Sequence, residues 1–175
     1  MKAWYFSGLD CMLRYGDGRI IKAGETHTVE CRPILCEQGL HGSVKPLDAI
    51  QYAPGPMVWR VELSGDLDIG DDKIAALERK YLWGYDATHV LRKFARLCAL
   101  DVIHLWNAPD VVVRYLKTGD ESLREAVRAT EWEAVRAAVR ATEWAARATA
   151  REAARAAGEK QNQRLYKMLM KGRAQ

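Results

Sequence analysis

The chain has 175 residues, enough for one modest domain with an appendage but hardly for two full cores. Hydrophobic residues make up 49% of it and charged residues 29%, which is typical of a folded protein and excludes the disordered class. The net charge is +4, but residues 123–175 hold 12 Lys and Arg against 6 Asp and Glu, so the rest of the chain carries −2. A mildly acidic body does not favour a general nucleic-acid surface, because non-specific affinity comes mainly from phosphate neutralisation.

The sequence shows no signal for export or for a membrane. No apolar run of the length that a signal peptide needs follows Met1, and no segment approaches the roughly 18 uncharged residues of a membrane span. We therefore expect a cytoplasmic protein that makes no membrane contact. In that compartment the four cysteines are expected to be reduced thiols, namely Cys11, Cys31, Cys36 and Cys98.

The first 85 residues predict a small β-rich domain with one short helix. Alternating apolar residues between turn residues indicate strands, and Gly16-Asp17-Gly18 is typical of a hairpin turn. Pro46 and the apolar spacing after it predict a helix over 46–53, and Gly65 to Asp72 is expected to be an acidic turn. The expected strands are residues 4–6, 12–15, 19–21, 26–29, 33–36 and 57–63, with one or two more within 73–83.

From Asp86 the apolar period becomes that of helices. Asp86 is the expected cap of a helix, and a second helix is expected from Pro109 to a stop at Thr118-Gly119. The fold class is therefore α+β: a β-rich domain at 1–85, helices packed on it at 86–119, and a long C-terminal helix at 120–175. The first helix has an expected buried stripe of Val90, Leu91, Phe94, Leu97 and Cys98.

The C-terminal segment is rich in Ala and Arg, and residues 126–132 recur as residues 138–144. On a helix, small side chains at steps of three and four form a seam that lets another helix approach closely. We expect this seam to make a homo-oligomer or to bind a partner. An arginine-rich arm for nucleic acid is the alternative, but glutamates interspersed at ion-pairing distances do not favour it. The expected interface residues are Leu123, Val127, Ala134, Ala138, Ala141 and Ala145.

Residues 36–43 are the stretch most suggestive of a functional site. Glycines around His41 and Ser43 predict a sharp turn whose backbone N–H groups receive an anion or a carbonyl oxygen, although the same glycines also suit a purely structural turn. We expect a ligand pocket near His41, Ser43, Tyr52 and Trp59.

No catalytic residues, cofactor or metal are predicted. The chain contains no G-x-S-x-G, no P-loop and no G-x-G-x-x-G. Residues of the types that usually bind zinc occur together, but their spacing is not that of a familiar zinc site. The residues in question are His27, Cys31, Cys36 and His41.

The stretch LCEQGLHGSVKPLDAIQYAPG, followed by VWRVELSG and DDKIAALERKYL, resembles a domain that is widespread in phage and prophage proteins. That domain pairs a C-x-x-G-[FL]-H turn with a P-L-D-x-x-x-Y helix, and it is often followed by an Ala-rich helical tail. The resemblance implies a phage-borne accessory protein that acts in the cytoplasm of a bacterial host. The turn at His41 and the helix with Ala49, Tyr52 and Ala53 are also similar to the front of ADP-ribosyltransferase-like folds, although no catalytic Glu can be assigned.

These observations favour a protein that acts by binding. We expect a counter-defence role, either as an inhibitor of a host immune component or by sequestering a small nucleotide signal. The partners would be a host bacterial protein or a nucleotide-like ligand. An enzyme that processes NAD or another nucleotide, and a nucleic-acid binder that uses the Arg-rich helix, are the alternatives.

Overall fold

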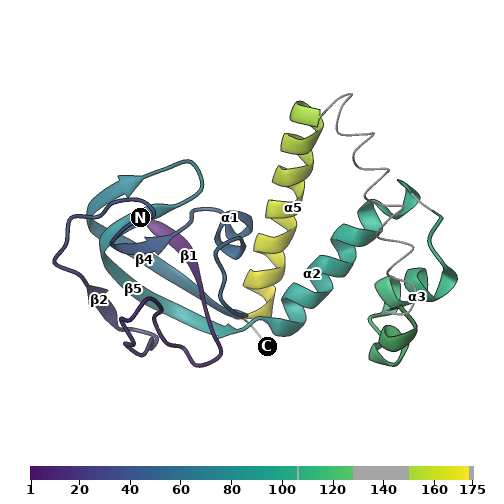
Figure 1. Ribbon diagram of the computed structural model, residues 1–175, viewed down its shortest axis with the longest axis horizontal. Helices are drawn as coiled ribbons and strands as arrows, with labels where there is room; N and C mark the ends of the chain where they lie inside the picture. Colours follow the sequence, from purple (N-terminus) through teal and green to yellow (C-terminus); the bar gives the residue numbers. More distant parts are fainter. Residues whose placement is uncertain (106, 128–149, 174–175) are drawn as a thin grey trace. The chain divides into compact units, whose positions relative to one another are not determined.

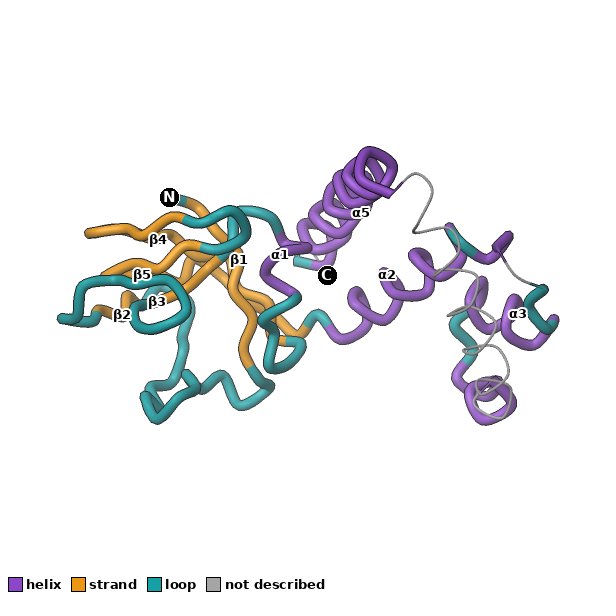
Figure 2. Tube along the Cα trace, turned by 45° about the horizontal axis from the view of Figure 1, so that its top comes forward, coloured by secondary structure: helices purple, strands orange, loops and turns teal. Residues whose placement is uncertain are grey.

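The computed structural model describes residues 1–105, 107–127 and 150–173, with the backbone alone for residues 150–156 (Figures 1 and 2). The fold is α+β, as the sequence predicts, with an antiparallel sheet in the N-terminal half and helices after it. The chain divides into two compact units, Met1–Val90 with Asn162–Gln175, and Leu91–Gln161. Among the described residues, no helix is both long and apolar enough to cross a bilayer.

The sheet of the first unit nearly closes on itself. Its hydrogen-bonded order is β1-β4-β5-β2, and β3 also pairs with β5. Ser43, directly after β3, exchanges backbone hydrogen bonds of 2.7 and 2.9 Å with Trp4 of β1, so the pairing β1-β4-β5-β3 returns to β1. The strands are β1 (Lys2–Ser7), β2 (Thr26–Thr28), β3 (Leu40–Gly42), β4 (Met57–Ile69) and β5 (Ile74–Asp86).

Strands β4 and β5 form one long hairpin of two 13-residue strands. The predicted acidic turn over Gly65–Asp72 is therefore wrong in its first half, because β4 continues to Ile69 through a bulge between Ser64 and Leu67. Gly65 has a φ of 74° in this bulge, a conformation that an L side chain rarely adopts. A second register shift between Arg60 and Val61 has its extra residue in β5, so the alternation along β4 continues and Trp59 shares the core face with Val61.

The predicted strand at residues 33–36 is wrong, because this segment is a turn closed by a bridge between Ile34 and Gln38. The predicted hairpin at 12–21 is reduced to a loop in which Met12 bridges Ile20. The short helix is confirmed as α1 (Pro46–Ile50), which follows β3 and contacts β1. The segment around His41, predicted as a turn, is strand β3.

One face of the sheet carries the main core. Ala3 from β1 and Val61 and Leu63 from β4 are fully buried there, and the loop at 8–25 contributes Leu13 and Ile21. Because successive residues of a strand point to opposite faces, Trp4 and Phe6 belong to the other side of β1. The first face is the one on which the loops between β1 and β3 lie.

The last turns of α5 (Ala150–Gly172) pack against the sheet of the first unit. Leu165 and Leu169 of this helix are fully buried. The Tyr85 hydroxyl donates a hydrogen bond of 2.7 Å to the Leu169 carbonyl, and Tyr166 makes an edge-to-face contact with Trp4. Gly158 lies inside this helix and does not interrupt it.

The second unit is helical. Helix α2 (Thr88–Asp101) begins after Asp86, whose carboxylate accepts the backbone N–H of Thr88, and a 3-10 turn, η1 (Ile103–Leu105), follows it. Helix α3 (Asp110–Thr118) ends at Gly119 with a φ of 72°, as predicted, and η2 (Glu121–Leu123) is capped by Asp120. Phe94 is buried and the other members of the predicted α2 stripe are partly buried.

Candidate functional site

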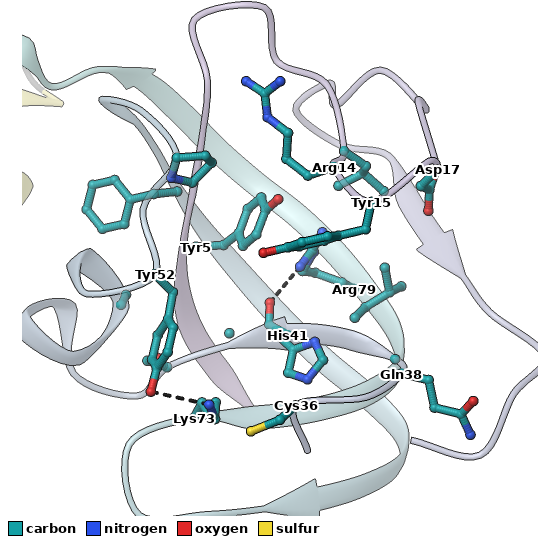
Figure 3. Close-up of a pocket in the computed structure, with 18 of the residues that line it drawn as sticks. Tyr5, Arg14, Tyr15, Asp17, Cys36, Gln38, His41, Tyr52, Lys73 and Arg79 are labelled. Carbon is teal, nitrogen blue, oxygen red and sulfur yellow. Dashed lines mark hydrogen bonds between the residues drawn. The ribbon is translucent and has the colours of Figure 1, made fainter. Parts of the chain in front are cut away.

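A cavity of about 640 Å³ lies on the first unit, a size common for small-ligand sites (Figure 3). Its walls come from β1, β3, β5, α1 and the two loops between β1 and β3. The cationic and neutral polar groups on these walls outnumber the acidic ones. The residues that matter below are Tyr5, Arg14, Tyr15, Asp17, Cys36, Glu37, His41, Ser43, Tyr52, Lys73 and Arg79.

Arg79 of β5 is the charged group of the cavity that is shielded most from water, since it is 2% exposed. Its Nε donates to the Tyr81 hydroxyl at 2.9 Å and its Nη1 to the His41 carbonyl at 2.5 Å. The guanidinium carbon lies 3.8 Å from the centre of the Tyr5 ring. No carboxylate of a described residue forms an ion pair with Arg79. No described residue accepts a hydrogen bond from its Nη2. The guanidinium is fixed in place while its charge stays uncompensated.

The groups that hold Arg79 are themselves neutral. The Tyr81 hydroxyl, fully buried, lies 3.2 Å from His27 Nδ1. Because this hydroxyl accepts a hydrogen bond from Arg79, its own proton is free to go to His27, which accepts it only as a neutral imidazole. Burial raises the pKa of Tyr81, and burial together with the charges of Arg19 and Arg79 lowers the pKa of His27. Both shifts favour the neutral forms.

His41 of β3 places its ring on the cavity wall, and its Nε2 is buried without a hydrogen-bond partner in the described part of the chain. Burial lowers the pKa of His41, and the nearby charge of Arg79 lowers it further. The imidazole is therefore neutral near pH 7. A buried polar atom without a partner is unusual in a folded protein.

Lys73 and Tyr52 form one rim of the cavity (Figure 3). The Lys73 ammonium lies 3.3 Å from the Tyr52 hydroxyl and 4.3 Å from the centre of its ring. The Tyr52 hydroxyl also donates to the carboxylate of Asp72. Hydrogen bonds that Lys73 donates to Cys36 and Tyr52 raise the pKa of Lys73, so its ammonium group stays charged.

The opposite rim is the loop after β1, which carries Arg14, Tyr15 and Asp17 (Figure 3). Both carboxylate oxygens of Asp17 accept hydrogen bonds of 2.7 Å from Arg19, which lowers the pKa of Asp17. Arg14 pairs with Asp10 at 3.2 Å. Tyr15 has a φ of 60° and a fully exposed side chain.

The structure brings three of the four predicted ligand residues together: His41, Ser43 and Tyr52 line the cavity. Trp59 lies instead in the core, 4% exposed, where its Nε1 donates to the Ser7 hydroxyl at 3.0 Å. The expectation of free backbone N–H groups in this stretch is not met at Ser43, whose N–H donates to the Trp4 carbonyl.

The other predicted sites have different outcomes. In the described residues, no three His, Cys, Asp or Glu side chains cluster closely enough to hold a metal ion. In the predicted interface, Leu123 and Val127 are described, whereas Ala134, Ala138, Ala141 and Ala145 lie outside the described residues. The helical seam therefore stays a prediction.

Sequence reasoning missed Arg79, Tyr15 and Lys73. A signal for Arg79 was present, because in a strand with period two Arg79 shares its face with Tyr81 and not with its charged neighbours Glu78 and Lys80. That face is the buried one. Tyr15 gave no such signal, because its role depends on where the loop returns over the sheet.

Comparison with known proteins gives a family for this region but no activity. No curated protein and no solved structure matches the chain. Residues 8–93 match the model of a family described as Domain of unknown function (DUF7666). The matched range contains all the cavity residues named above except Tyr5. The phage origin and the ADP-ribosyltransferase likeness stay predictions, and what the chain does contain is a DUF7666 domain, of unknown function, over residues 8–93.

Proposed function

We propose that this protein acts by binding, and that its cavity takes a small ligand that carries phosphate or a similar oxyanion. The observation that carries this proposal is the uncompensated Arg79 on the cavity wall. Holding a guanidinium away from water without a counter-charge costs several kcal/mol, and an oxyanion offsets that cost through charge-assisted hydrogen bonds. The planar fork of Arg suits phosphate in particular.

The other charges of the cavity support an anionic ligand. Lys73 adds positive charge at one rim, whereas Arg14 at the other rim is paired with Asp10. Of the acidic residues on the wall, Asp17 already has both oxygens bound by Arg19, and Glu37 is exposed. A ligand anion would therefore meet more attraction than repulsion from the charged groups of the wall.

Binding fits the site better than catalysis does. The NAD-processing alternative calls for a catalytic Glu, and none can be assigned from the sequence, while Asp17 on the wall has both oxygens bound by Arg19. The counter-defence role, by host inhibition or by sequestration of a nucleotide signal, stays a proposal that rests on the sequence resemblance. The same holds for a homo-oligomer and for a host protein as partner.

Titration calorimetry with inorganic pyrophosphate tests the proposal. We expect saturable binding by the wild-type protein and a loss of about ten- to a hundredfold in affinity for Arg79→Gln, because a hydrogen bond to a charged group contributes about 1.5–3 kcal/mol. Lys80→Gln is the matched control: it removes the same charge from the next residue of β5, where the side chain is exposed and off the cavity wall.

Arg79→Lys guards against a folding defect in the glutamine variant, since it keeps the charge and removes the fork. It should bind pyrophosphate more weakly than wild type and more tightly than Arg79→Gln. Equal affinities of the Arg79 and Lys80 variants would contradict the proposal, and so would the absence of binding by the wild-type protein to pyrophosphate and to phosphorylated ligands.

A further inference from the structure

Tyr15 is an aromatic residue in a position that does nothing for folding. Its side chain is fully exposed, with 106% relative exposure, yet it lies on the rim of the cavity and points over it (Figure 3). Its backbone has a φ of 60°, a conformation that is costly for a bulky residue. An exposed ring buries no area against the protein, so neither packing nor backbone preference accounts for Tyr at this position.

The loop that carries Tyr15 is held at its base. Leu13 and Ile21 are buried in the core, and the Leu13 N–H donates to the Arg19 carbonyl at 2.9 Å. Arg19 also reaches the Thr28 carbonyl at 2.9 Å, which ties the loop to β2. The ring of Tyr15 is therefore presented on an anchored loop.

The other aromatic rings named on the cavity wall either contact a cation or are buried. The guanidinium of Arg79 covers Tyr5 at 3.8 Å and the ammonium of Lys73 covers Tyr52 at 4.3 Å, while Trp4 and Phe6 are buried. Tyr15 keeps both ring faces open. An open aromatic face beside an anion site is the arrangement that receives a nucleobase, because every base stacks on it.

We propose that the cavity binds a nucleotide-type ligand, with its phosphate at Arg79 and its base stacked on Tyr15. This inference rests on the proposed function, because it adds a ring to the oxyanion already assigned to Arg79. The volume of about 640 Å³ lies within the range of sites for ligands of this size.

The test compares adenosine 5′-monophosphate with ribose 5-phosphate, which has the same sugar and phosphate but no base. By calorimetry, the wild-type protein should bind the nucleotide about tenfold more tightly. Tyr15→Asn should bring the nucleotide down to the affinity of ribose 5-phosphate and leave ribose 5-phosphate unchanged. Asn suits this variant because it tolerates a positive φ, so the ring is removed without adding backbone strain.

Two further variants make the result specific to the ring. Tyr15→Phe keeps the ring and should bind the nucleotide as wild type does. Leu9→Asn, at an exposed apolar residue off the cavity wall, is the matched control and should also bind as wild type.

The outcomes separate the two proposals. Equal affinities of the wild-type protein for the two probes would overturn the stacking inference and leave the oxyanion site standing. Wild-type affinity of Tyr15→Asn for the nucleotide would also overturn it. If neither probe nor pyrophosphate binds, both proposals fall.

Discussion

Around Arg79, neutral hydrogen-bond partners take the place that a carboxylate usually has beside a buried guanidinium. The partners are the Tyr81 hydroxyl and the His41 carbonyl, with the Tyr5 ring against the guanidinium plane. These groups fix the direction of the side chain without cancelling its charge. A site prepared in this way needs little rearrangement when an anion arrives, and that lowers the cost of binding.

The two buried histidines predict how stability depends on pH. The pKa values of His27 and His41 lie below the usual 6.5, chiefly because burial disfavours the charged form. The unfolded chain therefore binds more protons than the folded one as the pH falls through 6.5, and the free energy of unfolding decreases. Thermal unfolding between pH 7.5 and 5.5 should show a falling Tm.

The double variant His27→Gln/His41→Gln should flatten this pH profile, because glutamine does not titrate. A Tm of the wild-type protein that stays constant or rises over the same interval would contradict the assignment of neutral histidines. The carboxylate with a lowered pKa near the cavity, Asp17, titrates well below this interval and does not confuse the result.

Single site residues could be predicted from the sequence where they belong to a recognisable turn or helix motif. His41, Ser43 and Tyr52 were found through their glycine-rich turn and helix, and all three line the cavity. Trp59 lies on the face that the alternation along β4 predicts, together with Val61 and Leu63, but it is buried in the core there and does not reach the cavity. Arg79 was missed, since a run of three charged residues looks exposed until the strand's alternation is applied to each of them.

Among the elements, strand β4 shows why turn residues mislead. Gly65 and Asp66 predict a turn, but a bulge uses the positive φ of Gly65 and lets the strand continue. Strand β3 was not predicted, because its three residues pair with β5 only through contacts distant in sequence. A strand was expected at residues 33–36, but the bridge there joins Ile34 to Gln38, only four residues on, and closes a turn.

Helix α5 contributes to the core of the first unit, and this gives a prediction at the scale of the element. Leu169 is fully buried, so Leu169→Ala should lower the free energy of unfolding by about 2–5 kcal/mol through lost burial and an unfilled cavity. Urea unfolding measures the change. Lys167→Ala on the exposed side of the same helix is the control, and a Leu169→Ala protein within about 0.5 kcal/mol of that control would contradict the docking of α5.

In the whole molecule, the first unit is built from two distant pieces of the chain. Its sheet comes from Met1–Val90, and the chain returns to it from Asn162 onward. The domain that matches the family ends at residue 93, close to where the first piece ends. The packing of Leu165 and Leu169 therefore extends the matched domain with a segment outside it.

The basic surplus of the chain and the proposed anion site lie in different parts of the sequence. The basic surplus belongs to residues 123–175, whereas the anion site proposed here lies in the mildly acidic part. The placement of the buried Arg79, and not the net charge, gives the proposed site its preference for anions. The amino-acid composition does not show where the fold places individual charged side chains.

The central claim is that Arg79 meets an oxyanion, and nuclear magnetic resonance of the arginine side chains tests it directly. Titration with pyrophosphate should shift the Nε–Hε signal of Arg79 saturably, with the same dissociation constant as the calorimetry. The signal of Arg60, which lies against the Trp4 ring and off the cavity wall, should stay in place. An Arg79 signal that does not move while pyrophosphate binds, or that moves no more than that of Arg60, would contradict the account.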